Sequence, residues 1–306
     1  MPSAETSLRR AAAVVDDYLL VWILLAVSLG VAFPSLSLLS PLSTPVLAVM
    51  VAGVSLTLTP ARFRAVRPAS LATILLVQST MALLAFALAT AAGLSPPLTA
   101  GFVVVGAVTP ELVTPVMTEL ADGDTALATA ALVCVGLGSV AFVPAVVAWL
   151  LGDVAVDPFA VLSELAVAVV VPMSVAVGVR TRWPDRVGRY DDLYPSVSAL
   201  MVVLVVGVAA ASNARFVTDR PSLLVPVAAV AVALNGGGYA LGWLAGVRMD
   251  CDERIAATLS VGMRDFAVAA ALVLAAGFPT AGLAAVVFGV VEMVSSAALA
   301  QYFRST

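Results

Sequence analysis

The segment GAVTPELVTPVMTELADGD spans residues 106–124 and interrupts an apolar stretch that is long enough to cross a membrane. Pro110 and Pro115 stand five residues apart in it, with Glu111 between them. Each proline removes one backbone donor and frees the carbonyl that this donor would have bound. Freed backbone is tolerated at membrane depth only where protein buries it or where it lines a wet cavity. The segment therefore predicts a broken membrane helix at a binding site; a simple proline kink is the alternative.

A second stretch, LSVGMRDFAVAAAL at residues 259–272, places Arg264 and Asp265 in the middle of an apolar run. A charged side chain at the centre of a membrane helix costs about 2.5–3.5 kcal/mol on insertion scales, so such residues usually serve a function. Gly262 allows the backbone to unwind just before them. This stretch predicts a second break. The alternative is a structural ion pair that only pins two helices together.

Other polar residues in the apolar spans complete the predicted site. Asn235 precedes Gly236, Gly237 and Gly238, which interrupt the span at 222–247; close helix packing explains these glycines as well as a substrate path does. The predicted substrate- and ion-binding residues are Gln78, Thr109, Glu111, Thr114, Asn235, Ser260, Arg264, Asp265 and Glu292.

The composition places the chain in a lipid bilayer. Of its 306 residues, 62% are hydrophobic and only 11% are charged, and the mean hydropathy is +1.10. Soluble domains average about 45–50% apolar and about 25% charged residues. A helix crosses the hydrocarbon core with about 20 apolar residues. Ten such spans are predicted, at about 18–36, 42–59, 69–94, 97–120, 124–151, 158–179, 193–212, 222–247, 254–276 and 279–302.

The arginines predict the orientation of these spans. With the N-terminus inside, the inward segments hold twelve of the fifteen arginines, and the outward loops hold only Arg215 and Arg220. This bias follows the positive-inside rule and predicts a multi-pass plasma-membrane protein with both termini in the cytoplasm. Every basic residue is arginine and the pI is near 4.8. Such an acidic chain would suit the high-salt cytoplasm of a halophilic prokaryote.

The spans divide into two halves with similar spacing. The third span begins near residue 69 and the eighth near 222, and the fifth begins near 124 and the tenth near 279. Because five is odd, a five-span repeat must be inverted in the membrane, as in many secondary transporters. Apolar helices of similar length also look repetitive without any true repeat.

Several function classes find no support in the sequence. There is no histidine, and Cys134 and Cys251 are far apart, so neither a zinc site nor a resident cofactor is expected. The chain has no GxxxxGK[ST] loop and no basic patch, so nucleotide and nucleic-acid partners are not expected. A membrane enzyme would need clustered acids or a nucleophile with a base, and neither is present. The expected partners are the lipid bilayer and a small solute; a homo-oligomer stays open.

The chain resembles the bile acid:sodium symporter family at these same residues. VMTELADGDTAL at 116–127 and VGMRDFAVAAA at 261–271 are similar to the stretches that flank the two crossing points of that family. The resemblance implies an all-α membrane fold of ten helices in a 5+5 inverted repeat, with the fourth and ninth spans broken and crossing. It also implies a panel part, about 18–59 and 158–212, and a core part, about 69–151 and 222–302. Sodium and an organic anion would bind near the crossing.

The chain departs from the family where sodium would bind. The first crossover of the family carries a Gly-Gly-Thr-x-Ser-Asn run, and this chain has PELVTP at 110–115, where only Thr114 offers a hydroxyl. Two further hydroxyl ligands match Ala128 and Leu132. The second crossover of the family supplies a Glu, a Gln and an Asn, and the matching residues are Ser260, Arg264 and Asp265. Gln78, Thr114 and Ser260 would form at most a degenerate sodium site, because a hard cation needs several oxygen ligands.

These substitutions predict a transporter in which Arg264 takes the position of the cation. Glu111 and Asp265 would balance its charge, and a small organic anion would bind Arg264 through a bidentate contact, aided by the positive ends of the half-helices. Coupling would come from sodium at the degenerate site, or from a proton on Glu111 or Glu292. The alternatives are a non-transporting receptor or scaffold, and an exporter of an inorganic or weak-acid species.

Overall fold

The computed structural model describes residues 18–57, 66–151, 166–191, 193–219 and 221–304, together with residues 9, 10, 12, 14, 15 and 163. The described residues form helices and contain no strand, which confirms the predicted all-α class. The α-helices are α2 (Leu19–Ala32), α3 (Ser43–Ser55), α4 (Pro68–Ala91), α5 (Pro96–Ala107), α6 (Thr114–Leu120), α7 (Thr125–Leu151), α9 (Val171–Arg182), α10 (Pro184–Gly188), α11 (Tyr194–Ser212), α12 (Ala214–Asp219), α13 (Leu224–Ala245), α14 (Cys251–Gly262), α15 (Phe266–Ala275) and α16 (Pro279–Arg304). Short 3-10 helices at Pro34–Leu42, Pro221–Leu223 and Gly246–Arg248 and a π-helical turn at Ala166–Val170 complete them.

Seven segments of the described chain are long and apolar enough to cross a membrane, which makes this a multi-pass membrane protein. They are Pro34–Ser55, Pro68–Ala91, Thr125–Leu151, Tyr194–Ser212, Pro221–Arg248, Cys251–Ala275 and Pro279–Arg304. Val21–Ala32 and Pro96–Ala107 are shorter apolar helices. The ten-span 5+5 arrangement and the cytoplasmic position of both termini stay predictions.

Some predicted residues lie outside the described part of the chain. They are Arg62, Arg64 and Arg220, residues 58–59 of the second predicted span, and residues 158–162, 164 and 165 of the sixth.

Two local features of the structure differ from the simplest expectation. The first span was expected to run to residue 36, but α2 ends at Ala32 because Pro34 restricts the backbone of Phe33 and starts a 3-10 helix. The glycine run after Asn235 was expected to interrupt its span, but α13 is continuous from Leu224 to Ala245. In lipid a helix keeps its internal hydrogen bonds because no water replaces them. Of the three glycines, Gly238 makes the close helix contact that the packing interpretation expects.

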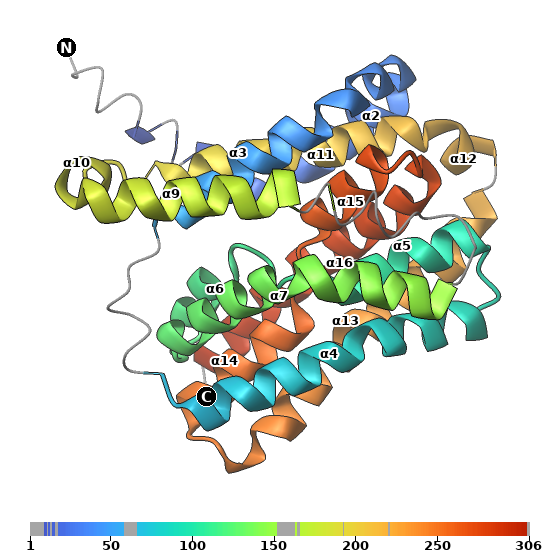
Figure 1. Ribbon diagram of the computed structural model, residues 1–306. Helices are drawn as coiled ribbons and strands as arrows, with labels where there is room; N and C mark the ends of the chain where they lie inside the picture. Colours follow the sequence, from blue (N-terminus) through green and yellow to red (C-terminus); the bar gives the residue numbers. More distant parts are fainter. Residues whose placement is uncertain are drawn as a thin grey trace.

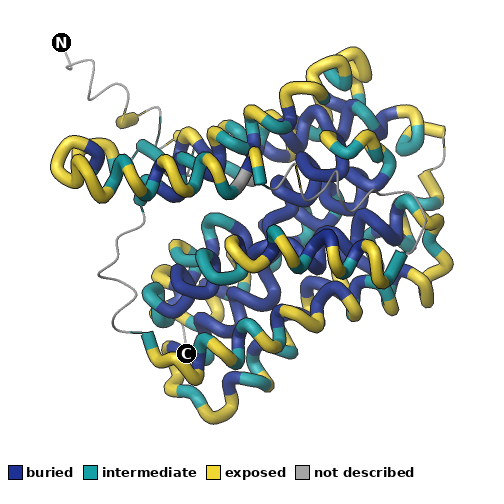
Figure 2. The backbone as a smooth tube through the Cα atoms, in the orientation of Figure 1, coloured by how far each residue is buried: buried dark blue, intermediate teal, exposed yellow. Residues whose placement is uncertain are grey.

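The helices form two groups (Figure 1). In the first group α11 packs against α2 and α3, and α3 packs against α9. In the second group α4 packs against α5 and α13, α13 against α14, and α16 against α5, α13 and α15. The first group touches the second chiefly where α11 meets α15 and α16 and where α3 meets α15. Buried residues concentrate along α5, α14 and α15, in the middle of the molecule (Figure 2).

Glycines allow α13 and α14 to approach each other closely. A Cβ on Gly238 would lie 2.8 Å from Cα of Gly262, and one on Gly242 would lie 2.6 Å from the carbonyl oxygen of Ala257. Gly236 faces away from this contact, and its Cβ would meet nothing within 4 Å. Small residues at such contacts are typical of membrane helix packing.

Replacing Gly242 by alanine is therefore expected to destabilise the protein by about 1–3 kcal/mol, because the new methyl meets backbone that cannot move aside. Gly236→Ala on the same helix is the matched control and is expected to be neutral or to stabilise slightly, since alanine favours a helix over glycine. Thermal unfolding of the purified protein in detergent measures both. Equal losses in the two variants would contradict this account of the packing.

Candidate functional site

The first half of the site is the non-helical segment 108–113 between α5 and α6. In a continuous helix the carbonyl of Gly106 would accept the N–H of residue 110, but Pro110 has none. The Thr109 hydroxyl donates to the carbonyl of Leu132 on α7, at 3.1 Å, which anchors the segment to the core. Helix α5 therefore ends at Ala107, shortly before the first of the two prolines.

The second half of the site is the connection 263–265 between α14 and α15. The backbone N–H of Asp265 donates to the carbonyl of Thr109 at 2.9 Å, so the two breaks are bonded directly to each other. The backbone N–H of Arg264 donates to Oε2 of Glu292, on α16, at 3.0 Å. Interrupted membrane helices need such partners for the backbone groups that they free.

Acidic side chains gather at the N-terminus of α15. Asp265 is the N-cap of this helix, and its Oδ1 accepts the N–H of Val268 at 2.8 Å. The carboxyl of Glu111 faces the N–H of Phe266. Carboxylates are favourable at this end because the unpaired N–H groups give it a partial positive charge. Two of the predicted acids therefore stabilise one helix terminus.

Arg264 caps the C-terminal end of α5, the type of helix end that is favourable for a positive charge. Its guanidinium is fully buried, and Nη2 donates to the carbonyl of Gly106, the one that Pro110 leaves free. Nε lies 3.4 Å from the carbonyl of Val105. These carbonyls form the negative C-terminal end of α5, where a cation is favourable. The guanidinium thus occupies a carbonyl-lined position of the kind that suits a metal cation.

The charges of the site are held apart rather than paired. Glu111 is 2% exposed, and Asp265 and Glu292 are fully buried. Among the described residues, no carboxylate oxygen lies within 4.0 Å of the Arg264 guanidinium. The cation sits at the end of α5 and the acids sit at the start of α15 and on α16. The site is therefore organised by two helix termini.

The polar atoms without partners all fall on predicted residues. In the described part of the chain, eight buried side-chain nitrogen and oxygen atoms have no hydrogen-bond partner. They belong to Gln78, Glu111, Thr114, Ser260, Arg264, Asp265 and Glu292. Buried polar groups are usually hydrogen-bonded, and exceptions are explained by strain, by a functional role, or by a bound water or ion. Seven of the nine predicted residues meet this description.

Asn235 forms hydrogen bonds through both its amide nitrogen and its amide oxygen, and it stabilises the backbone next to the connection 263–265. Its Nδ2 donates to the carbonyl of Gly262, the last residue of α14, at 3.1 Å. Its Oδ1 accepts from Ser295 at 2.6 Å, and Ser295 lies 3.3 Å from the hydroxyl of Tyr239. Sequence reasoning did not find Ser295 or Tyr239. The hydroxyl groups of these two residues, which stand inside apolar spans, were the feature of the sequence that could have indicated them.

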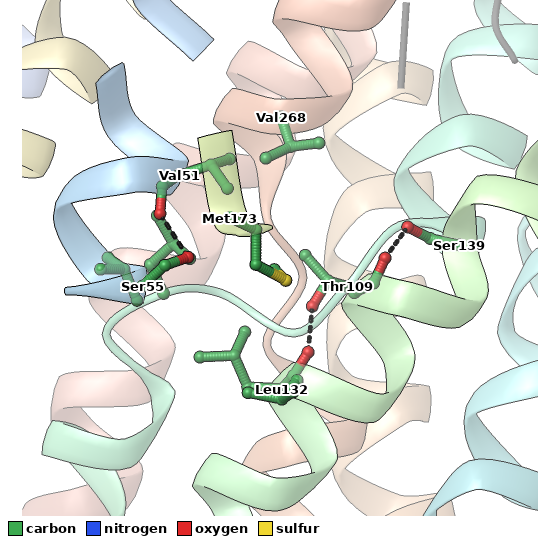
Figure 3. A pocket seen from close by; sticks show the side chains of 11 residues that line it. Val51, Ser55, Thr109, Leu132, Ser139, Met173 and Val268 are labelled. Atoms are coloured by element: carbon green, nitrogen blue, oxygen red, sulfur yellow. Dashed lines mark hydrogen bonds between the residues drawn. The ribbon is translucent and has the colours of Figure 1, made fainter. Parts of the chain in front are cut away.

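A small, partly open cavity lies beside the segment 108–113 (Figure 3). It is bounded by α3 and α9 of the first group and by α7, α15 and residues 109 and 112 of the second. Its lining residues are Val51, Val54, Ser55, Thr109, Leu112, Leu132, Val133, Gly136, Ser139, Met173 and Val268. Of the predicted residues only Thr109 lines it. Arg264 does not, so the expected bidentate contact with a bound anion is not available here.

The residues present do not fit a family-type sodium site. The carbonyls of Val105 and Gly106 already accept from Arg264. The described residues contain no group of three or more His, Cys, Asp or Glu that could hold a metal. Gln78, Thr114 and Ser260 are buried with unpartnered atoms, and three such ligands fall short of what a hard cation needs.

Comparison with known proteins finds two sequence matches. The profile of the Sodium Bile acid symporter family matches residues 44–220, more than half of the chain and including the break at 108–113. A curated relative from Bacillus subtilis (strain 168), named "Uncharacterized sodium-dependent transporter YocS", is 28% identical over 293 residues. That alignment covers 92% of this chain and 89% of the relative.

Proposed function

Because the chain belongs to the sodium bile acid symporter family, we propose that it is a secondary transporter that moves a small organic anion by alternating access. Family membership also argues against an enzyme. The relative whose name calls it sodium-dependent supports transport as the shared activity. The coupling ion is where this chain differs.

We propose that Arg264 replaces the coupling sodium, and one observation supports this most directly. The guanidinium donates to the carbonyl that Pro110 frees at the end of α5. A positive charge is thereby supplied at the crossing by the chain itself. A metal cation and a guanidinium would compete for the same carbonyl oxygens, and the tethered one cannot dissociate. A proton is then the ion that accompanies the solute.

The fold we propose is the ten-helix 5+5 inverted repeat, with α5–α6 and α14–α15 as the two broken, crossing helices. The hydrogen bond between Asp265 and Thr109 joins the two breaks and supports their crossing. The panel would comprise α2, α3, α9 and α11, and the core the remaining long helices, in keeping with the two packed groups. The solute would bind in the cavity between them and move as the core shifts against the panel.

A comparison of sodium with potassium tests the proposed coupling without knowledge of the solute. The thermal stability of the purified protein is expected to be the same in sodium and potassium chloride at equal ionic strength. An ion that binds only the folded state would raise stability by RT ln(1 + [L]/Kd), which is about 2.7 kcal/mol at a hundredfold excess over Kd. A stabilisation specific to sodium would overturn the proposal for Arg264.

Solute flux tests transport itself. Proteoliposomes are loaded with a panel of small organic acids and assayed for exchange against the same labelled acid outside. At least one acid is expected to exchange in potassium medium without sodium, and faster than in protein-free liposomes that measure passive leakage. Exchange that requires sodium would contradict the proposed coupling, and no exchange of any acid would favour the receptor or scaffold alternative.

A further inference from the structure

Among the described residues that line the cavity, each side-chain hydroxyl already donates its hydrogen to a backbone carbonyl. The Ser55 hydroxyl donates to the carbonyl of Val51 at 2.7 Å, and that of Ser139 donates to Gly136 at 2.7 Å. The Thr109 hydroxyl donates to Leu132 at 3.1 Å. A hydroxyl has one hydrogen and two lone pairs, so each oxygen keeps only acceptor capacity (Figure 3). The rest of the lining is apolar side chain and one glycine.

A carboxylate is poorly matched to this cavity. It is an acceptor only, so it needs donors, and none of the described residues that line the cavity has a charged side chain. The guanidinium of Arg264 directs Nε and Nη2 at the carbonyls of α5. Behind the lining, Glu111 follows Thr109 by two residues and Asp265 precedes Val268 by three, and both are acids. Burying a carboxylate without donors, beside acids, is costly.

A protonated carboxylic acid fits the same lining. Its O–H is a donor that any of the three hydroxyl oxygens can accept, and its apolar body can contact Val51, Leu112 and Met173. We propose that the solute occupies the cavity as a neutral monocarboxylic acid with a compact apolar body. One proton is taken up with each anion on one side and released with it into water on the other, so no net charge moves.

This inference rests on the proposed function and deepens it, since it names the solute class and places the proton. In the part of the chain that the structure describes, the charged groups of the neighbouring site are Glu111 and Asp265 at the start of α15, Glu292 on α16, and Arg264. All four are buried, and none of them is a lining residue of the cavity. The proton therefore resides on the solute itself, and the pH dependence of binding follows the acidity of the solute.

Equilibrium binding to the purified protein tests whether the solute binds as a neutral acid, using ligands of similar shape. Because no vesicle is needed, passive leakage of weak acids through lipid does not interfere. The probes are labelled cyclohexanecarboxylic acid, its more acidic α-fluoro derivative, the carboxamide and the sulfonate. Above the solution pKa of each acid, its affinity is expected to fall about tenfold per pH unit. The curve of the fluoro acid is expected at lower pH, by the difference between the two solution pKa values. The amide is expected to bind independently of pH and the sulfonate not to bind.

Matched cavity variants locate the binding. Gly136→Leu is expected to abolish it, because a side chain there grows toward Met173 and Thr109, whose atoms lie 3.7 and 3.8 Å from its Cβ position. Gly138→Leu, on the same helix with open space around it, is the control and is expected to bind normally.

Three results would each overturn the inference. The sulfonate could bind as tightly as the carboxylate, the two acids could share one pH curve, or neither acid could bind at any pH. The first two would leave the proposed transport function intact, because the sodium comparison and the exchange assay decide that separately.

Discussion

Replacing Arg264 by glutamine is expected to reduce solute exchange below detection and to destabilise the folded protein by about 3–5 kcal/mol. The side chain is fully buried and donates to backbone carbonyls at the end of α5. Without it, the carbonyl of Gly106 has no donor, and the buried acids Glu111, Asp265 and Glu292 lose the only cation among the described residues that is buried with them. Exchange in proteoliposomes and thermal unfolding in detergent measure the two effects.

The matched control is Arg248→Gln, an arginine at the exposed junction between α13 and α14. It is expected to leave both quantities nearly unchanged. If the Arg264 variant were as stable and as active as the control, the guanidinium would have no part in the site.

Replacing Glu292 by leucine is expected to produce the second largest effect, a loss of about 2–3 kcal/mol of stability together with most of the exchange activity. The fully buried carboxylate accepts the backbone N–H of Arg264 at 3.0 Å, and leucine leaves that N–H unpaired. Leaving a buried donor unsatisfied costs about 1–3 kcal/mol, and more when a charge is involved. Thermal unfolding measures the loss.

The variant Glu292→Gln separates the hydrogen bond from the charge. Its amide oxygen can still accept the N–H of Arg264, so the variant keeps the hydrogen bond and removes only the ability of the side chain to ionise, and we expect roughly half the destabilisation of the leucine variant. Equal effects of leucine and glutamine would show that the charge alone matters. A neutral leucine variant would exclude Glu292 from the architecture of the second break.

Much of the membrane fold could be predicted from the sequence because each segment in lipid must satisfy its backbone hydrogen bonds within itself, which depends on local sequence alone. Each apolar run of about 20 residues must be helical, so the helices were expected at nearly the right positions. The differences from the prediction lie at positions where contacts between helices, or a proline, determine the backbone conformation. Pro34 ended α2 early, and the glycines after Asn235 remained helical because α13 uses Gly238 and Gly242 to pack against α14.

The candidate site was predictable where it contains polar residues and invisible where it does not. Glu111, Arg264 and Asp265 stand out in apolar runs, and the structure buries them around the two breaks. The side chains of Val51 and Met173, which line the cavity, look like any lipid-facing residue in the sequence. That they face a cavity depends on how α3 and α9 lie against α7, which no local pattern encodes. The direction of the Arg264 side chain, toward carbonyls rather than toward the cavity, was equally hidden.

In the proposed mechanism, the covalent attachment of the guanidinium that caps α5 limits how far a cell could accumulate solute. Each elementary charge that crosses a membrane held at 100 mV contributes about 2.3 kcal/mol, which corresponds to roughly fortyfold accumulation. Arg264 cannot leave on the far side, so none of that energy reaches the solute. With an electroneutral acid as cargo, the steady-state ratio of anion inside to outside is set by the pH difference alone, about tenfold per unit. Such a carrier would concentrate its solute in acidic surroundings and merely equilibrate it in neutral ones.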